Sequence, residues 1–123
     1  MNKAIRRALI SVYDKERLVE VGTALHAAGA EILSTGSTAT SLIAAGVPVT
    51  EVSDYTGFPE IMNGRVKSLH PRIHAGILAR RDSDMEILSD RGYETIDLVI
   101  ANLYPFKETI ASGCSFEEAI EKI

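Results

Sequence analysis

The segment 31–39, EILSTGSTA, decides the fold that the sequence predicts. Its first four residues form a short apolar run, which is long enough for a strand and too short for a helix. A turn of glycine and hydroxyl residues follows, and we expect a helix from about Ser37 to Ala45, ended by Gly46. This order of strand, turn and helix is typical of α/β proteins.

The same alternation continues on both sides of this segment. The strand at 97–103, DLVIANL, is an unbroken apolar run suited to a sheet buried on both faces. Pro48 lacks an N–H and so places its strand at or near a sheet edge. We expect residues 54–63, with Gly57 and Pro59, to form a loop. The pattern favours one α/β domain with a parallel sheet; its other strands are predicted at 7–12 and 47–52, and its other helices at 16–28, 71–79, 85–91 and 115–122.

Polar residues gather where three of the predicted strands end. Ligands of parallel sheets bind beyond the carboxyl ends of the strands, and helix N-termini receive anions well. The sequence therefore predicts an anion site at this edge, although a serine or threonine that only caps a helix is common. A Walker-type ATP loop is not expected, because no Gly-Lys-Ser/Thr ending is present. The candidates are Ser11, Tyr13, Asp14 and Lys15; Thr35, Gly36, Ser37 and Thr38; and Asn102 and Tyr104.

The segment 63–76, NGRVKSLHPRIHAG, is the basic part of an acidic chain. No carboxylate occurs from 61 to 81, whereas the net charge of the chain is -4. Arg65, Lys67 and Ser68 offer a planar guanidinium, an ammonium and a hydroxyl, which are groups that bind phosphate well. The alternative is a solvated basic loop. For His70 and His74 we expect structural hydrogen bonds and no metal, because Pro71 lies between them and neither a cysteine nor a third histidine is near.

Length and composition limit the possible functions. A chain of 123 residues, 46% hydrophobic and 24% charged, fits one globular domain. A pI near 5.3 argues against a nucleic-acid partner. No apolar stretch is long enough to span a membrane. One cysteine, Cys114, leaves no internal disulfide and fits a reducing compartment, so we expect a cytoplasmic protein.

Five motifs in order and spacing, SVYDK, STGSTA, TGFPE, GRVKSLHPRIHAGILAR and NLYPF, resemble a known enzyme family. They are similar to the amino-terminal inosine monophosphate (IMP) cyclohydrolase domain of bifunctional purine-biosynthesis enzymes, whose second domain is a formyltransferase. The resemblance covers nearly the whole chain. STGSTA is shared with related phosphate-binding domains, whereas GRVKSLHP followed by HAGILAR is far more specific.

The resemblance implies a methylglyoxal-synthase-like fold, with three α/β/α layers and a five-stranded parallel sheet. The implied substrate is a formamido imidazole-carboxamide ribonucleotide (FAICAR), which closes its second ring to give IMP and water. That step implies no cofactor and no metal; 10-formyltetrahydrofolate serves only the formyltransferase domain, and the parent enzymes are homodimers. The nucleotide-binding positions that the resemblance implies are Tyr13, Asp14, Lys15, Thr35, Gly36, Ser37, Thr38, Arg65, Val66, Lys67, Ser68, Ala101 and Asn102, and it places Tyr104 near the reacting base. We add Ser11 to the binding positions because it lies at the end of the first strand, and we take Lys67 and Tyr104 as the catalytic candidates.

The chain departs from the family pattern at three places. Tyr13 stands where many relatives have serine, and Ser68 stands where many have threonine. An Asp-Ile-Gly-Gly segment and a further catalytic lysine of the family are expected beyond Ile123 and are absent, as is the formyltransferase domain. We therefore expect residues 1–123 to be a truncated cyclohydrolase domain that binds a nucleotide and turns it over poorly.

Lys67 is expected to stabilise the charge that grows on the formyl oxygen during ring closure, and Tyr104 is expected to orient the base or relay a proton. Two other functions remain open. A methylglyoxal synthase would need an aspartate base beside the phosphate. A regulatory domain like that of carbamoyl phosphate synthetase would bind the nucleotide without changing it.

Overall fold

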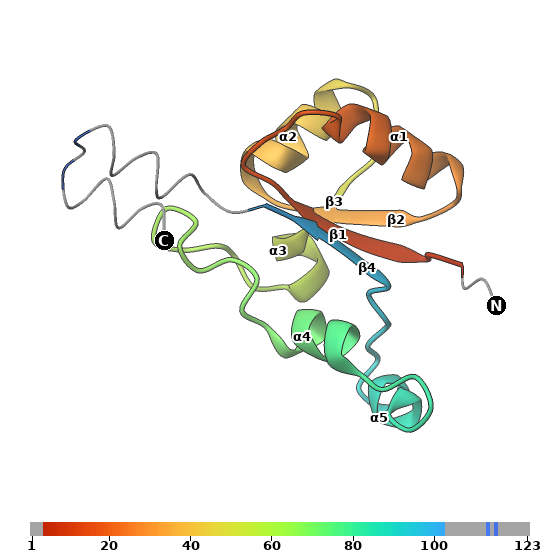
Figure 1. Cartoon of the computed structure of the whole chain (residues 1–123). Helices are drawn as coiled ribbons and strands as arrows, with labels where there is room; N and C mark the ends of the chain where they lie inside the picture. Colours follow the sequence, from red (N-terminus) through yellow and green to blue (C-terminus); the bar gives the residue numbers. More distant parts are fainter. Residues whose placement is uncertain (1–3, 103–112, 114, 116–123) are drawn as a thin grey trace.

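The computed structural model describes residues 4–102, 113 and 115, which form one parallel sheet between two layers of helices (Figure 1). The sheet has the strand order β3-β2-β1-β4. Helices α1 and α2 cover one face, and α3, α4 and α5 lie on the other side. The strands are β1 (Arg7–Ser11), β2 (Glu31–Ser34), β3 (Thr50–Glu51) and β4 (Leu98–Ala101); the helices are α1 (Leu18–Ala27), α2 (Gly36–Ala44), α3 (Val52–Thr56), α4 (Pro71–Leu78) and α5 (Met85–Asp90).

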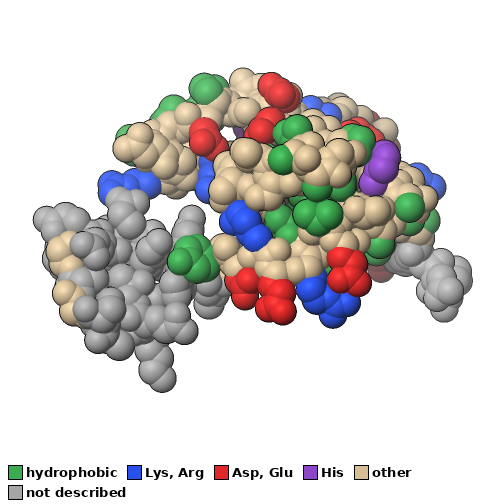
Figure 2. All heavy atoms as spheres, turned by 90° about the horizontal axis from the view of Figure 1, so that it is seen from above, with side chains coloured by type: hydrophobic (Ala, Val, Ile, Leu, Met, Phe, Trp, Pro, Cys, Tyr) green, Lys and Arg blue, Asp and Glu red, His purple; other side chains and the backbone are tan. Residues whose placement is uncertain are grey.

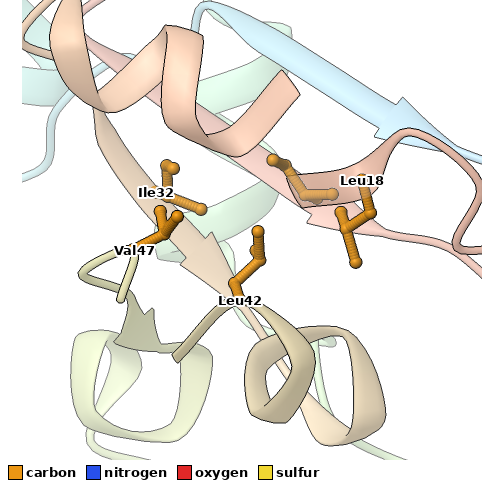
Figure 3. Packing of buried hydrophobic residues seen from close by; sticks show 5 residues of the cluster. Leu18, Ile32, Leu42 and Val47 are labelled. Carbon is orange, nitrogen blue, oxygen red and sulfur yellow. The ribbon is translucent and has the colours of Figure 1, made fainter. Parts of the chain in front are cut away.

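The first core fills the space between the sheet and α1 and α2. Figure 3 shows how closely its side chains pack, and Gly22 is the reason the two helices can approach. A Cβ atom at Gly22 would lie 2.5 Å from the Leu42 Cδ2 atom. The buried members of this cluster are Ile10, Leu18, Ile32, Leu42 and Val47.

The second core lies on the opposite face of the sheet. Ile32 and Leu33, neighbours on β2, belong to different cores because successive side chains of a strand point to opposite faces. The α4 helix packs closely here, since a Cβ atom at Gly76 would lie only 2.8 Å from the Glu94 carbonyl oxygen. The buried members are Leu33, Val52, Tyr55, Ile73 and Ile96.

The α/β fold with a parallel sheet is confirmed, and so is the edge position of β3. The five-stranded sheet is corrected to four strands within the described residues. The strand expected at 97–103 is present as β4, but the expectation that both of its faces are buried is wrong, because Val99 is 46% exposed. In the described part of the chain β4 is also an edge strand.

Two local predictions also need correction. The loop expected at 54–63 begins as helix α3, which packs Tyr55 into the second core. Helix α1 starts at Leu18 rather than at residue 16, because Asp14 Oδ1 accepts a hydrogen bond from the Glu16 N–H at 2.9 Å in a turn that precedes the helix. The helix expected at 115–122 lies outside the described residues except for Ser115.

Candidate functional site

A pocket of about 160 Å³ opens at the edge of the sheet where β1, β2 and β4 end. These strands are parallel, so their carboxyl ends meet at the same edge. Eight of the fourteen predicted binding residues lie together in its wall. The lining residues are Ser11, Val12, Tyr13, Lys15, Thr35, Ser37, Thr38, Lys67 and Asn102.

The start of α2 presents uncapped donors to this pocket. Gly36 has a φ of 56°, a value that favours glycine and allows the abrupt change from strand to helix. Thr35 occupies the N-cap position, but its side chain makes no cap hydrogen bond. Its hydroxyl is buried and has no hydrogen-bond partner within the described structure, and the residue is 7% exposed. The first N–H groups of a helix have no intrahelical acceptor, and the Thr35 hydroxyl lies beside them with an unused donor.

Thr38 holds the end of β1 against α2. Its hydroxyl accepts a hydrogen bond from the Val12 N–H at 3.2 Å and donates one to the Val12 carbonyl oxygen at 3.1 Å. The residue is 3% exposed. The Thr38 hydroxyl thus forms part of the pocket wall and is already engaged with the backbone.

Lys15 brings the first cation to the pocket. Its ammonium donates hydrogen bonds to the carbonyl oxygens of Val12, at 2.9 Å, and Tyr13, at 3.3 Å. An ammonium carries three N–H donors, so one remains for a ligand. Val12 is a residue that the sequence reasoning missed. Its only sequence signal is its place directly after the last residue of β1.

Lys67 brings the second cation from a distant loop. Ile61 and Val66 form an antiparallel bridge, and the turn between them contains three consecutive residues of positive φ, namely Met62, Asn63 and Gly64. This hairpin carries Lys67 to the pocket that α2 and the β1 end form. Among the described residues, the Lys67 ammonium has no hydrogen-bond or ion-pair partner.

Three other cations of residues 61–81, namely Arg72, Arg80 and Arg81, contact other parts of the fold. Arg72 lies 3.9 Å above the centroid of the Tyr55 ring and donates a hydrogen bond to the Tyr55 carbonyl oxygen. Arg80 pairs with Asp84 at 2.9 Å. Arg81 donates to carbonyl oxygens, among them that of Ile96 at 3.0 Å. The segment therefore contributes one cation to the pocket wall rather than a continuous basic surface.

Six predicted binding residues do not line the pocket. Asp14 and Ala101 line a neighbouring cavity of about 120 Å³, which shares Val12 and Asn102 with it. Val66 and Ser68 flank Lys67 and are half-buried. Gly36 and Arg65 complete the six. The predicted catalytic Tyr104 lies outside the described residues.

A larger cavity, of about 510 Å³, lies near the amino-terminal ends of β1 and β4. The one carboxylate among its described lining residues, Asp97, already has hydrogen-bond donors and a cation beside it. Asp97 accepts hydrogen bonds from the N–H groups of Arg6, at 2.9 Å, and Arg7, at 3.2 Å, and lies 3.8 Å from Arg81. Burial alone would raise the pKa of Asp97, but these donors and the Thr95 hydroxyl together lower it below its ordinary value.

The histidines of the basic segment have structural contacts. His70 caps α4, because its Nδ1 accepts a hydrogen bond from the Arg72 N–H at 3.0 Å. The His74 ring lies 3.3 Å from the His70 carbonyl oxygen. No group of three potential metal ligands occurs in the described part of the chain. Over the same residues, no helix is long and apolar enough to cross a membrane.

Comparison with known proteins gives a family. The model of the MGS-like domain matches residues 17–123. The crystal structure of ForH resembles this structure with a TM-score of 0.74 and 34% sequence identity, over 80% of this chain and 53% of ForH. The chain thus spans about half the length of ForH. Because the family model matches most of its residues, the chain belongs to the MGS-like domain family.

Proposed function

We propose that this domain binds the phosphate of a purine-type ribonucleotide and closes the ring of FAICAR to give IMP. One observation carries the proposal. The buried Thr35 hydroxyl and the Lys67 ammonium line the same pocket, and neither has a hydrogen-bond partner among the described residues. An unpaired buried hydroxyl such as that of Thr35 costs free energy, and the ammonium of the half-buried Lys67 adds a positive charge at the same place, so the pair favours an anion that accepts hydrogen bonds.

The charge of the pocket favours a phosphate monoester. Its wall holds two ammonium groups and several hydroxyls, and no carboxylate lies among the lining residues that the structure describes. On the face seen in Figure 2, acidic and basic side chains are interspersed and neither forms a continuous patch. A positive site confined to one pocket suits a small anion better than a polymer.

The pocket is large enough for only part of a nucleotide. A volume of about 160 Å³ is below that of most sites for whole drug-sized ligands, which span about 300–1,000 Å³. We assign it to the phosphate and the adjoining ribose, with the base beyond the opening. The choice of FAICAR among phosphorylated ligands is supported by the similarity of GRVKSLHP and HAGILAR to the cyclohydrolase domains.

Ring closure joins two arms of one molecule. The carboxamide nitrogen attacks the formyl carbon and a C–N bond forms. The tetrahedral carbon then loses the former formyl oxygen as water, with one proton from the carboxamide nitrogen and one from the formamido nitrogen, and a C=N bond replaces the broken C–O bond. Holding the two arms together removes an entropic barrier. The Lys67 ammonium stabilises the negative charge that grows on that oxygen, an effect typically worth about 3–4 kcal/mol. Tyr104 is the proposed partner that orients the base.

Calorimetric titration with IMP and with inosine tests the phosphate site, and absorbance during incubation with FAICAR tests the reaction. We expect IMP to bind at least about 100-fold more tightly than inosine, because two or more charge-assisted hydrogen bonds are lost without the phosphate. Lys67→Ala should weaken IMP binding about tenfold and slow ring closure by about 10²-fold or more.

Arg91→Ala is the matched control, since it removes one exposed positive charge outside the pocket wall. It should leave both measurements unchanged. Equal binding of IMP and inosine would contradict the phosphate site. Tight IMP binding without ring closure would contradict the enzymatic part and favour a regulatory nucleotide-binding domain.

A further inference from the structure

The loop that carries Lys15 is held in place by the side chain of Asn102, which is distant in the sequence. Asn102 follows β4, and its amide makes three hydrogen bonds to the backbone of Tyr13 and Asp14. We infer that Asn102 is a positioning residue, which sets the place of the Lys15 ammonium by fixing the loop after β1. The consequence for ligand binding rests on the proposed function, whereas the consequence for Lys15 itself does not.

The hydrogen bonds fix both the place and the orientation of the amide. Asn102 Oδ1 accepts from the Tyr13 N–H at 2.6 Å and from the Asp14 N–H at 3.1 Å. Asn102 Nδ2 donates to the Asp14 carbonyl oxygen at 3.0 Å. Two backbone donors require the oxygen on one side, and a backbone acceptor requires the nitrogen on the other. The amide can therefore be placed in one way only.

The fixed loop supplies the acceptors of Lys15. The ammonium donates to the carbonyl oxygens of Val12 and Tyr13, which belong to the backbone immediately before Asp14. Thr38 fixes Val12 from the other side, through both its N–H and its carbonyl oxygen. Removal of the Asn102 amide would free the Tyr13 end of this arrangement while the Val12 end stays held. The expected result is a displaced ammonium in a folded protein.

Asn102 has little capacity left to bind a ligand directly. An asparagine amide offers two acceptor positions and two N–H donors, and three of these four are used by the loop. Asn102 does line the pocket, so a direct contact is the rival explanation. The two roles differ in one respect: a positioning role depends on Lys15, and a direct contact does not.

The first experiment needs no ligand. The full chain is treated briefly with acetic anhydride, and the acetylation of Lys15 and Lys67 is measured by peptide mass spectrometry. In Asn102→Ala, acetylation of Lys15 should rise about fivefold, the factor that corresponds to losing roughly one neutral hydrogen bond. Lys67 should change less than about twofold, so it serves as the internal standard. An unchanged ratio of the two lysines would overturn the inference.

Two further variants serve as a control and as a conservative substitution in this experiment. Thr23→Ala removes an exposed side chain of α1 and should leave the ratio unchanged. Asn102→Asp keeps an acceptor for both loop N–H groups and loses only the bond to the Asp14 carbonyl. It should retain slow hydrogen exchange at the Tyr13 and Asp14 amides and raise Lys15 acetylation less than Asn102→Ala. If Asn102→Ala does not fold, this variant carries the test: slow exchange at both amides with a raised ratio of Lys15 to Lys67 acetylation supports the role, and an unchanged ratio would reject it.

The second experiment separates positioning from direct contact by a double-mutant cycle with IMP as the probe. Asn102→Ala should weaken binding about tenfold in the natural sequence and less than about twofold in Lys15→Ala. An equal loss in both backgrounds would show that Asn102 contacts the ligand itself and would overturn the inference. If the natural sequence does not bind IMP, the proposed function fails, and the acetylation experiment alone decides the role of Asn102.

Discussion

The Thr38 hydroxyl and the Lys15 ammonium share one acceptor, the carbonyl oxygen of Val12, at 3.1 and 2.9 Å. Thr38 comes from α2, and Lys15 precedes α1. The single carbonyl therefore ties the end of β1 to α2 and to the loop that carries the first cation of the pocket. A substitution of either side chain should therefore alter the position of the other.

This relationship predicts a difference between two substitutions of Thr38. Thr38→Val replaces the hydroxyl by a methyl group and leaves the Val12 N–H and carbonyl with fewer partners, so it should lower the free energy of unfolding by about 1–3 kcal/mol. Thr38→Ser keeps the hydroxyl and should cost less than about 1 kcal/mol. Urea unfolding followed by circular dichroism measures both values. Equal losses for valine and serine would contradict a role for the two hydrogen bonds.

Thr35 should behave in the opposite way. Its hydroxyl is buried without a partner in the described structure, so Thr35→Val removes a polar group whose burial costs free energy. We expect the ligand-free protein to become more stable, by about 1 kcal/mol, while IMP binding weakens about tenfold. The matched control is Thr40→Val on the exposed side of α2, which should not change IMP affinity. Unchanged affinity in Thr35→Val would exclude its hydroxyl from the binding site.

The sequence was sufficient to predict the parallel α/β fold and the edge at which the pocket lies, because both follow from the order of strands and helices. It was not sufficient for α3. A helix of five residues has little stability of its own and forms here because Val52 and Tyr55 pack into the second core. The apolar run of β4 likewise gave no sign that, within residues 4–102, this strand lies at an edge of the sheet.

The polar residues of the pocket were predictable from their positions, but their hydrogen bonds were not. The segment 61–81 has no carboxylate of its own, yet folding brings Asp84 to Arg80 and Asp97 to Arg81. Both carboxylates lie outside residues 61–81, so a count of charges within that segment does not reveal these ion pairs. The same limit applies to Asn102, whose contacts with the Tyr13–Asp14 backbone depend on the register of β4 against β1.

Two glycines of the cores should differ in their tolerance of alanine. The new Cβ atom in Gly76→Ala would lie 2.8 Å from the Glu94 carbonyl oxygen, which belongs to the backbone. In Gly22→Ala it would meet the Leu42 Cδ2 atom, which ends a side chain and can shift by a change of rotamer more easily than a backbone atom can. We expect Gly76→Ala to destabilise the protein by about 2–3 kcal/mol and Gly22→Ala by less, as measured by thermal or urea unfolding. The reverse order would contradict the close approach of α4 to residue 94.

Asp97→Asn should change how the stability of the protein depends on pH. The pKa of Asp97 in the folded protein is lowered from its ordinary value of 3.8, so the ionised carboxylate stabilises the fold above about pH 4, and this contribution is lost as the pH falls through the folded pKa. The variant should therefore be less stable than the natural sequence at pH 7, by about 1 kcal/mol or less because Asp97 is partly exposed, and the difference should shrink below pH 4. Urea unfolding between pH 2.5 and 7 measures this difference in stability.

Asp90→Asn, which removes an exposed carboxylate at the end of α5, is the control and should leave the acid dependence close to that of the natural sequence. A stability difference for Asp97→Asn that stays constant over this range would show that its hydrogen bonds to Arg6 and Arg7 do not depend on its charge.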